Sequence, residues 1–106
     1  MTFDELKTHA LTIRDKYRKQ NADLGRTEWK IKDYYQGFIG DIGDLGKLIM
    51  TRENLREYES SEEKLKHELA DCLWSLIVIA DGLGIDLERA FLNAKLSTLE
   101  KKEGNP

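Results

Sequence analysis

Residues His67–Asp86, HELADCLWSLIVIADGLGID, hold the longest mainly apolar run of the chain. At about 100° per residue, apolar residues spaced three or four apart share one helix face: Leu65, Leu69, Cys72, Leu76, Ile79 and Leu83. Trp74, Ile77 and Val78 fall on other faces. A helix that is apolar all round must be covered all round. Three short companion helices hardly suffice for that, so we predict a homo-oligomer, either a homodimer or a dimer of dimers.

Helix start and stop signals lie on both sides of this segment. They predict a first helix that begins at the capping box of Thr2 and Glu5 and ends in a turn within residues 21–25, and a second that runs from a Thr27 cap to about Met50. A third helix is predicted from the capping box of Ser60 and Glu63 to Asp81. A fourth is predicted from Leu87 to about Lys102. The charged segment at residues 51–64, TRENLREYESSEEK, is interpreted as a mobile loop. No segment alternates with the period of two that strands show. The sequence therefore predicts one all-α domain over residues 1–106, similar to a four-helix bundle.

Composition excludes several classes of protein. The 106 residues carry a formal net charge of -3, whereas binding to a nucleic-acid polymer needs a basic excess. The mainly apolar run of residues 72–80 is too short to cross a bilayer. A single cysteine, Cys72, forms no internal disulfide, and the acidic start of the chain is unlike a signal peptide. We therefore expect a cytoplasmic protein with no membrane or nucleic-acid partner.

Two pairs of carboxylates stand out, each with members three residues apart. Asp41 and Asp44 lie in the second predicted helix, and Glu68 and Asp71 in the third. A spacing of three places both members of a pair on one helix face. If the two helices pack side by side, the four carboxylates converge and require cations, for which Mg2+ or Mn2+ is the natural choice. The alternative is that both pairs lie on solvated helix faces.

The acidic pairs are embedded in two segments that resemble the MazG-like all-α nucleoside triphosphate pyrophosphohydrolases. These segments are GFIGDIGDLGKLI at residues 37–49 and KHELADCLWSLIVIADGLGIDLERAF at residues 66–91. The family's second motif, Glu-x-x-Asp, is present as Glu68 and Asp71. Its first motif, Glu-Glu-x-x-Glu, is matched by Asp41 and Asp44 at the second and third acids, while Gly40 stands where the leading glutamate would be.

The resemblance implies an enzyme that splits a nucleoside triphosphate between its α and β phosphates and releases a monophosphate and pyrophosphate. Asp41, Asp44, Glu68 and Asp71 would be its metal ligands and catalytic residues, with Mg2+ (or Mn2+) as cofactor. Substrate-binding candidates are Lys47, Lys95 and Trp29. Two alternatives stay open: a phosphoribosyl-ATP pyrophosphohydrolase-like enzyme, and a helical nucleotide-binding or interaction module without catalysis, which the missing glutamate at Gly40 would favour.

Glycines recur every three residues through the second predicted helix, at Gly37, Gly40, Gly43 and Gly46. Each costs about 1 kcal/mol relative to alanine in a helix interior. Gly37 and Gly40 flank the acidic face, where they would let a ligand or helix approach the backbone. We interpret Gly43 and Gly46 as positions of tight helix packing.

Overall fold

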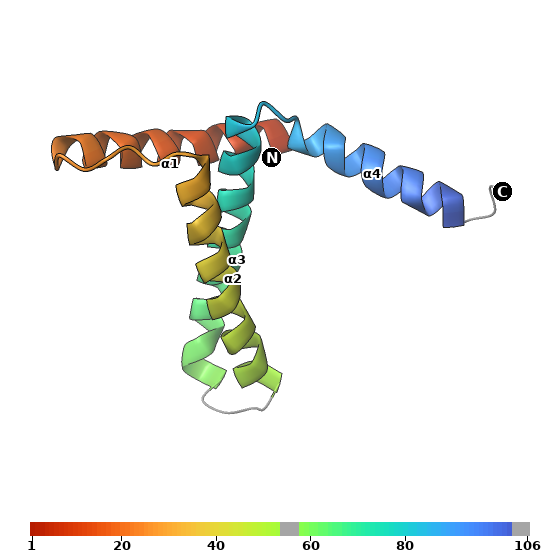
Figure 1. Cartoon of the computed structure of the whole chain (residues 1–106). Coiled ribbons are helices and arrows are strands. Elements are labelled where there is room, and N and C mark those ends of the chain that lie inside the picture. Colours follow the sequence, from red (N-terminus) through yellow and green to blue (C-terminus); the bar gives the residue numbers. More distant parts are fainter. Residues whose placement is uncertain (54–57, 103–106) are drawn as a thin grey trace.

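The computed structural model describes residues 1–53 and 58–102. Within these ranges the chain folds into four helices and no strand (Figure 1): α1 (Phe3–Asp23), α2 (Ile31–Glu53), α3 (Tyr58–Gly82) and α4 (Leu87–Lys102). The predicted all-α class is confirmed. None of the helices in this described part is long and apolar enough to span a membrane.

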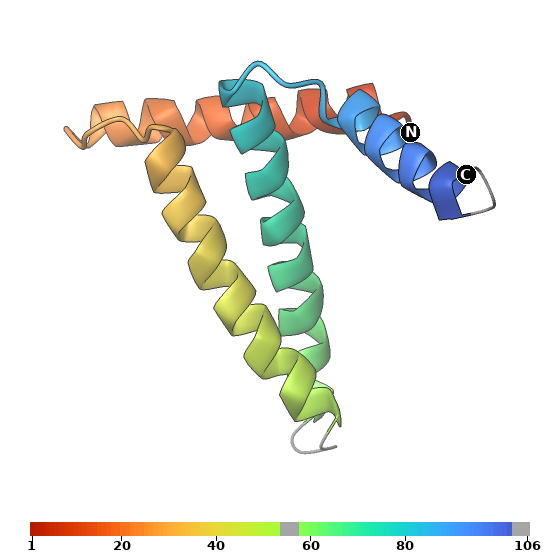
Figure 2. The ribbon, with the colours of Figure 1, turned by 45° about the vertical axis from the view of Figure 1, so that its right-hand side comes forward.

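The helices form a hairpin with one crosspiece and one projecting arm. α2 and α3 run antiparallel and side by side, α1 lies across one end of this hairpin, and α4 leads away from it (Figures 1 and 2). The radius of gyration is 17.3 Å, whereas a compact chain of this length has about 13 Å. A single chain therefore does not close into the predicted four-helix bundle, because α1 crosses the hairpin and α4 leaves it.

Local capping fixes both ends of α1 as the sequence predicts. The Glu5 backbone N–H donates to the Thr2 hydroxyl at 3.2 Å, and this hydroxyl donates in turn to Glu5 Oε1 at 3.2 Å. At the other end, Gly25 has a φ of 69°, in the left-handed region that glycine adopts without strain. The Arg26 N–H donates to the Asn21 carbonyl at 2.8 Å, which closes the helix with the hydrogen bond of a Schellman motif.

The predicted start of α2 at Thr27 is wrong, since the helix begins at Ile31. The N–H of Lys30 donates to Oδ2 of Asp33 at 2.8 Å, so Asp33 supplies the carboxylate half of a capping box. Before it, Trp29 packs edge to face on Tyr34, with ring centroids 5.3 Å apart. Thr27 thus lies in the connection that carries Trp29 to the surface of α2.

The interpretation of residues 51–64 as a loop is also largely wrong. α2 continues to Glu53 and α3 already begins at Tyr58, so Ser60 lies inside α3 and is not its cap; residues 54–57 are outside the described ranges. Glutamate and lysine are good helix formers, and Lys66 pairs with Glu63 one turn away at 3.2 Å. A highly charged segment can therefore extend a helix into solvent.

The core lies between α2 and α3 and continues under α1 where that helix crosses the hairpin. Trp74 of α3 donates from Nε1 to the carbonyl of Ala10 at 3.0 Å, and its ring contacts Tyr17 and Tyr34 edge to face. The buried apolar residues include Ala10, Tyr34, Leu65, Cys72, Ile77, Val78 and Ala80. Three members of the predicted buried stripe of α3 are instead exposed, namely Leu69, Leu76 and Leu83. One side of α3 is thus covered by the chain itself and another is not.

The segment Gly82–Asp86 ends α3 and starts α4, as predicted. Gly84 has a φ of 70°, and the Ile85 N–H donates to the Ala80 carbonyl at 2.9 Å. Asp86 then accepts from the Arg89 N–H at 3.0 Å, which satisfies one of the free amides in the first turn of α4.

Candidate metal centre

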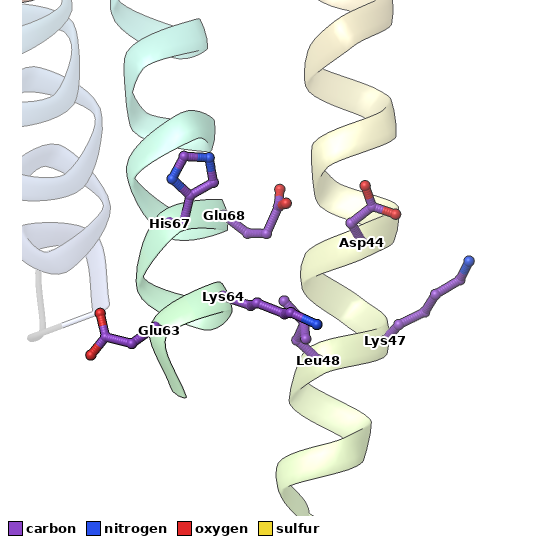
Figure 3. Close-up of a pocket in the computed structure, with 7 residues that line it drawn as sticks. All are labelled: Asp44, Lys47, Leu48, Glu63, Lys64, His67 and Glu68. Carbon is purple, nitrogen blue, oxygen red and sulfur yellow. The ribbon is translucent and has the colours of Figure 1, made fainter. Parts of the chain in front are cut away.

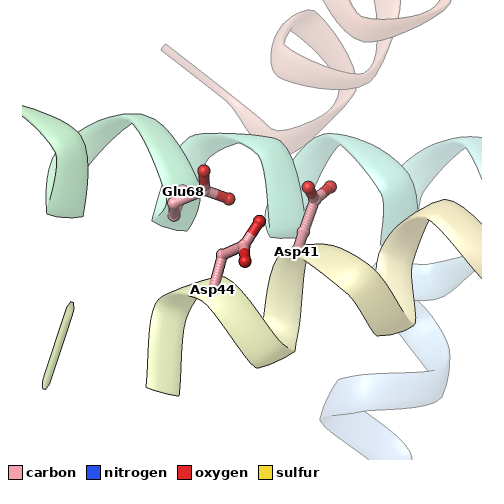
Figure 4. Close-up of side chains that lie close together, drawn as sticks. All are labelled: Asp41, Asp44 and Glu68. Carbon is pink, nitrogen blue, oxygen red and sulfur yellow. The ribbon is translucent and has the colours of Figure 1, made fainter. Parts of the chain in front are cut away.

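Three of the four predicted acids converge between α2 and α3. Asp41, Asp44 and Glu68 each offer a carboxylate oxygen, and these oxygens lie within 4.8 Å of one another. Figure 4 shows the two aspartates on α2 and Glu68 on the facing turn of α3. The convergence follows from the spacing of three on α2 and from the antiparallel packing of the two helices. Oxygen donors in this arrangement suit a hard divalent cation.

The local electrostatics fit such a cation. Burial, followed by the charges of Asp71 and Asp44, raises the pKa of Asp41. Burial, followed by the charges of Asp41, Asp44 and Asp71, raises the pKa of Glu68. In addition, Glu68 Oε2 is buried and has no hydrogen-bond partner. A buried carboxylate oxygen without a partner is costly, and a cation ligated by it would remove that cost.

Asp71, the fourth predicted acid, lies beside this group. Its Oδ2 is 3.2 Å from Nε2 of His67, one helical turn earlier on α3. Sequence reasoning did not include His67 in the site, although its spacing of four from Asp71 is a signal for contact on a helix. His67 therefore orients the Asp71 carboxylate through Oδ2, and Oδ1 can make another contact.

An aromatic pocket of about 630 Å³ opens on one side of the acidic cluster. Asp41 and Asp71 form its acidic edge, and its other lining residues include Ile13, Tyr17, Asn21, Arg26, Trp29, Tyr34, Gly37 and Trp74. Gly37 lies beside the Trp29 ring, and a Cβ there would be 3.5 Å from that ring, which is an ordinary van der Waals contact. The pocket is assembled from α1, the connection before α2, and the two hairpin helices, so helix periodicity alone did not reveal it.

A second pocket, of about 460 Å³, adjoins the other side of the cluster. Asp44 and Glu68 line it together with Lys47, Leu48, Glu63, Lys64 and His67. In Figure 3, Lys64 reaches from α3 toward α2, whereas Lys47 points outward from α2. Lys64 is not one of the substrate-binding residues that the sequence predicts. The acidic cluster thus separates an aromatic pocket from a pocket that carries lysines and a histidine.

The other residues considered in the sequence analysis do not join the acidic cluster. Lys95 lies on α4, which leads away from the hairpin (Figure 1), so it is remote from the acids within one chain. Gly40 is exposed, and no atom lies within 4 Å of where its Cβ would be. Cys72 is buried, and burial, followed by the nearby carboxylates, raises the pKa of its thiol. A thiol in that environment is a poor nucleophile.

Comparison of the chain with protein-family models, with curated proteins and with solved structures gives no match.

Proposed function

We propose that this chain is a MazG-like, Mg2+-dependent nucleoside triphosphate pyrophosphohydrolase. The observation that carries the proposal is the convergence of Asp41, Asp44 and Glu68 beside an aromatic pocket that shares Asp41. A nucleotide needs both surfaces at once, since its base stacks on aromatic rings and its phosphates require cations. The two sequence motifs that resemble the family lie on the helices that form this site.

The polarity of the site suggests how a nucleoside triphosphate would be oriented. The nucleoside would lie in the aromatic pocket, where Trp29 offers an exposed ring. The triphosphate would run across the acidic cluster toward Lys64 and His67 in the second pocket. This direction would bring the α-phosphate next to the cluster and would place the β- and γ-phosphates beside Lys64 and His67.

Asp41, Asp44 and Glu68 would hold Mg2+, or Mn2+ in its place. A divalent ion bound there supplies charge neutralisation for the triphosphate and acidifies a water molecule. Asp71, oriented by His67, would accept the proton of the attacking water on Oδ1. The water oxygen would form a bond to the α-phosphorus while the bond to the oxygen bridging the α and β phosphates breaks. The products would be a nucleoside monophosphate and pyrophosphate, and Lys64 would offset the charge of the departing pyrophosphate.

Product analysis tests this proposal. The purified chain is incubated with Mg2+ and separate ribo- and deoxyribonucleoside triphosphates and with phosphoribosyl-ATP, and pyrophosphate and monophosphate are both quantified. We expect equal amounts of the two products from at least one nucleotide, loss of turnover in Asp44→Asn, and unchanged turnover in Glu88→Gln on α4. Turnover of phosphoribosyl-ATP alone would select the related histidine-precursor enzyme. Nucleotide binding without any product would select the non-catalytic module.

We further propose that the chain works as a homo-oligomer, a dimer or a dimer of dimers. Its extended shape and its exposed apolar residues on α2, α3 and α4 support this.

A further inference from the structure

A third pocket, of about 440 Å³, opens between α1, the connection before α2 and the adjoining ends of the two hairpin helices. The connection runs back alongside α1 before α2 begins (Figures 1 and 2). Among the described residues that line this pocket, four are basic and one is acidic: Arg14, Arg18, Lys30, Lys32 and Glu28. The rest of its lining includes Trp29, Ile31, Tyr34, Val78 and Gly82. We call it the basic pocket.

The basic pocket belongs to a basic part of an acidic chain. Residues 14–32 carry seven basic and three acidic side chains, a net charge of +4, although the whole chain has a net charge of -3. The other residues therefore carry a net charge of -7, and the carboxylates of the candidate metal centre are among them. Such a separation of charge attracts an anion to the basic segment and repels it from the acidic cluster.

Arg14 and Gly82 fix the walls of the basic pocket. All three guanidinium nitrogens of Arg14 are engaged, Nη1 with Asp81 at 2.7 Å, and Nε and Nη2 with Asp15 at 3.1 Å and 3.0 Å. A Cβ at Gly82 would be 3.0 Å from Cγ1 of Ile31, so the glycine lets the start of α2 pack closely on the end of α3. The frame of the pocket is thus held by the chain itself.

The other three basic side chains are available to a ligand. Arg18 Nη1 lies 3.8 Å from Oδ1 of Asp15, and Arg18 Nε lies 3.4 Å from Oε1 of Glu28. Both distances exceed the ~2.7–2.9 Å of a charge-assisted hydrogen bond. In the described part of the chain, neither Lys30 nor Lys32 forms an ion pair. A phosphate group would give these cations the short hydrogen bonds that they do not make there.

The Glu28 carboxylate occupies the position of such an anion. Its side chain is 68% exposed and its partner Arg18 is 41% exposed, and an exposed pair of this kind contributes little to stability. A doubly charged phosphate would therefore displace it. Glu28 directly precedes Trp29, which lines both the basic pocket and the aromatic pocket. An occupant of the basic pocket would thus contact the tryptophan that the two pockets share.

We propose that the basic pocket binds a phosphate-bearing anion through Arg18, Lys30 and Lys32, in place of the Glu28 carboxylate. Pyrophosphate carries the group that these cations recognise, and the aromatic and apolar part of the lining also suits the body of a small phosphorylated molecule. Binding at this site needs no metal ion and depends neither on the acidic cluster nor on catalysis.

Calorimetric titration with pyrophosphate, in the presence of a metal chelator, tests the proposal. We expect saturable binding that the double variant Lys30→Gln/Lys32→Gln weakens by about tenfold or more, because charge-assisted contacts are lost. The matched control, Lys16→Gln/Lys19→Gln, removes the same charge from exposed positions of the basic segment and should weaken binding far less. Equal losses in the two double variants would show only a general attraction to the segment and would overturn the proposal. No binding by the unmodified chain at millimolar pyrophosphate would overturn it as well.

Two further measurements locate the anion. Glu28→Gln removes the competing carboxylate and should tighten binding by up to about fivefold; weaker binding would contradict the displacement. Pyrophosphate should also change the tryptophan emission, and Trp29→Phe should lose this change, because Trp74 is not among the described residues that line the basic pocket. Weaker binding in Lys64→Gln, with none in the Lys30→Gln/Lys32→Gln variant, would place the anion in the second pocket and reject the proposal.

A parallel titration with ADP, under the same metal-free conditions, distinguishes the two sources of the phosphate group. Equal dissociation constants for pyrophosphate and ADP would show that the site recognises the phosphate group alone. Binding of ADP that is about tenfold tighter, and that the Lys30→Gln/Lys32→Gln variant loses, would show that the site takes a phosphorylated molecule with a larger body.

Discussion

Arg14 of α1 donates from Nη1 to Oδ2 of Asp81 on α3 at 2.7 Å, and this contact fixes the crosspiece to the end of the hairpin. Arg14 is the less exposed partner, with 14% of its side chain accessible against 31% for Asp81. Together with the hydrogen bond from Trp74 to Ala10, it sets where α1 crosses α3. The aromatic pocket depends on that crossing, because Tyr17 and Asn21 of α1 form part of its wall.

Removal of this contact should destabilise the fold. We expect Asp81→Asn to lower the free energy of unfolding by about 1.5–3 kcal/mol, the range for a hydrogen bond to a charged group. The matched control is Glu28→Gln, which removes an exposed pair with Arg18 at 3.4 Å and should cost less than about 1 kcal/mol. Urea unfolding of both variants measures the difference. Equal losses would mean that Arg14 and Asp81 act as an ordinary surface pair.

Both ends of α1 and the turn into α4 could be predicted from the sequence because capping is local. Thr2 with Glu5, and the glycines Gly25 and Gly84, act within a few residues, so their side chains and φ angles decide the outcome. The predicted start of α2 at Thr27 was wrong because a threonine is only one of several residues that can cap a helix. In this chain Asp33 supplies the cap of α2.

The candidate site was predictable only in part. The spacing of Asp41 and Asp44 placed both on one face, and the structure brings Glu68 to them. The aromatic pocket was not foreseen, since Trp74 meets Ala10 across 64 positions of the chain and such contacts depend on where α1 crosses. Lys95 was expected at the site, but the direction of α4 places it elsewhere within one chain. Asp71 was expected to be a metal ligand, and in the structure its carboxylate contacts the His67 ring.

The raised pKa of Glu68 predicts a specific pH dependence of stability. Because its carboxyl has a higher pKa when folded than when unfolded, the folded state binds more protons between these two values. Stability without metal is therefore lost as pH rises through that window. We expect Glu68→Gln to stabilise the metal-free chain at neutral pH and to have no such effect below the ordinary pKa of glutamate, 4.5. Thermal melts across pH, with Glu88→Gln as control, test this; a gain independent of pH would contradict it.

Divalent ions should stabilise the folded chain by preferential binding. At a concentration one hundred times the dissociation constant, the gain in the free energy of unfolding is about 2.7 kcal/mol. We expect Mn2+ to raise the melting temperature of the unmodified chain and of Glu88→Gln, and to have little effect on Asp44→Asn. Calorimetric titration with Mn2+ measures the affinity directly. If Mn2+ at millimolar concentration leaves the melting temperature unchanged, the three carboxylates do not form a metal site.

The aromatic pocket predicts a separation of binding from turnover. Stacking of a base on an aromatic ring contributes about 1–3 kcal/mol. We therefore expect Trp29→Ala to raise KM for the preferred nucleotide by roughly 5- to 150-fold, with a smaller change in kcat, and Trp29→Phe to recover most of the loss. Steady-state kinetics at fixed Mg2+ supply both constants. A fall in kcat alone would place the base elsewhere.

Gly40 provides the sharpest comparison, because it stands where the resemblance places a glutamate. No described atom lies within 4 Å of a Cβ built at this position, so an added methyl group meets no obstacle in the described part of the chain. Gly40→Ala should therefore stabilise α2 by up to about 1 kcal/mol, the helix cost of glycine.

Gly40→Glu adds a carboxylate on the edge of α2 that carries Asp44. Without metal, we expect it to gain less stability than Gly40→Ala, because the new charge lies near the existing carboxylates. With Mn2+, its affinity should exceed that of the unmodified chain, since an added carboxylate brings charge to the cation. Calorimetric titration and thermal melting of the alanine and glutamate variants separate the two effects. Weaker Mn2+ binding together with a lower melting temperature in both variants would show that a bare backbone is required at this position, either for a substrate or for a neighbouring chain.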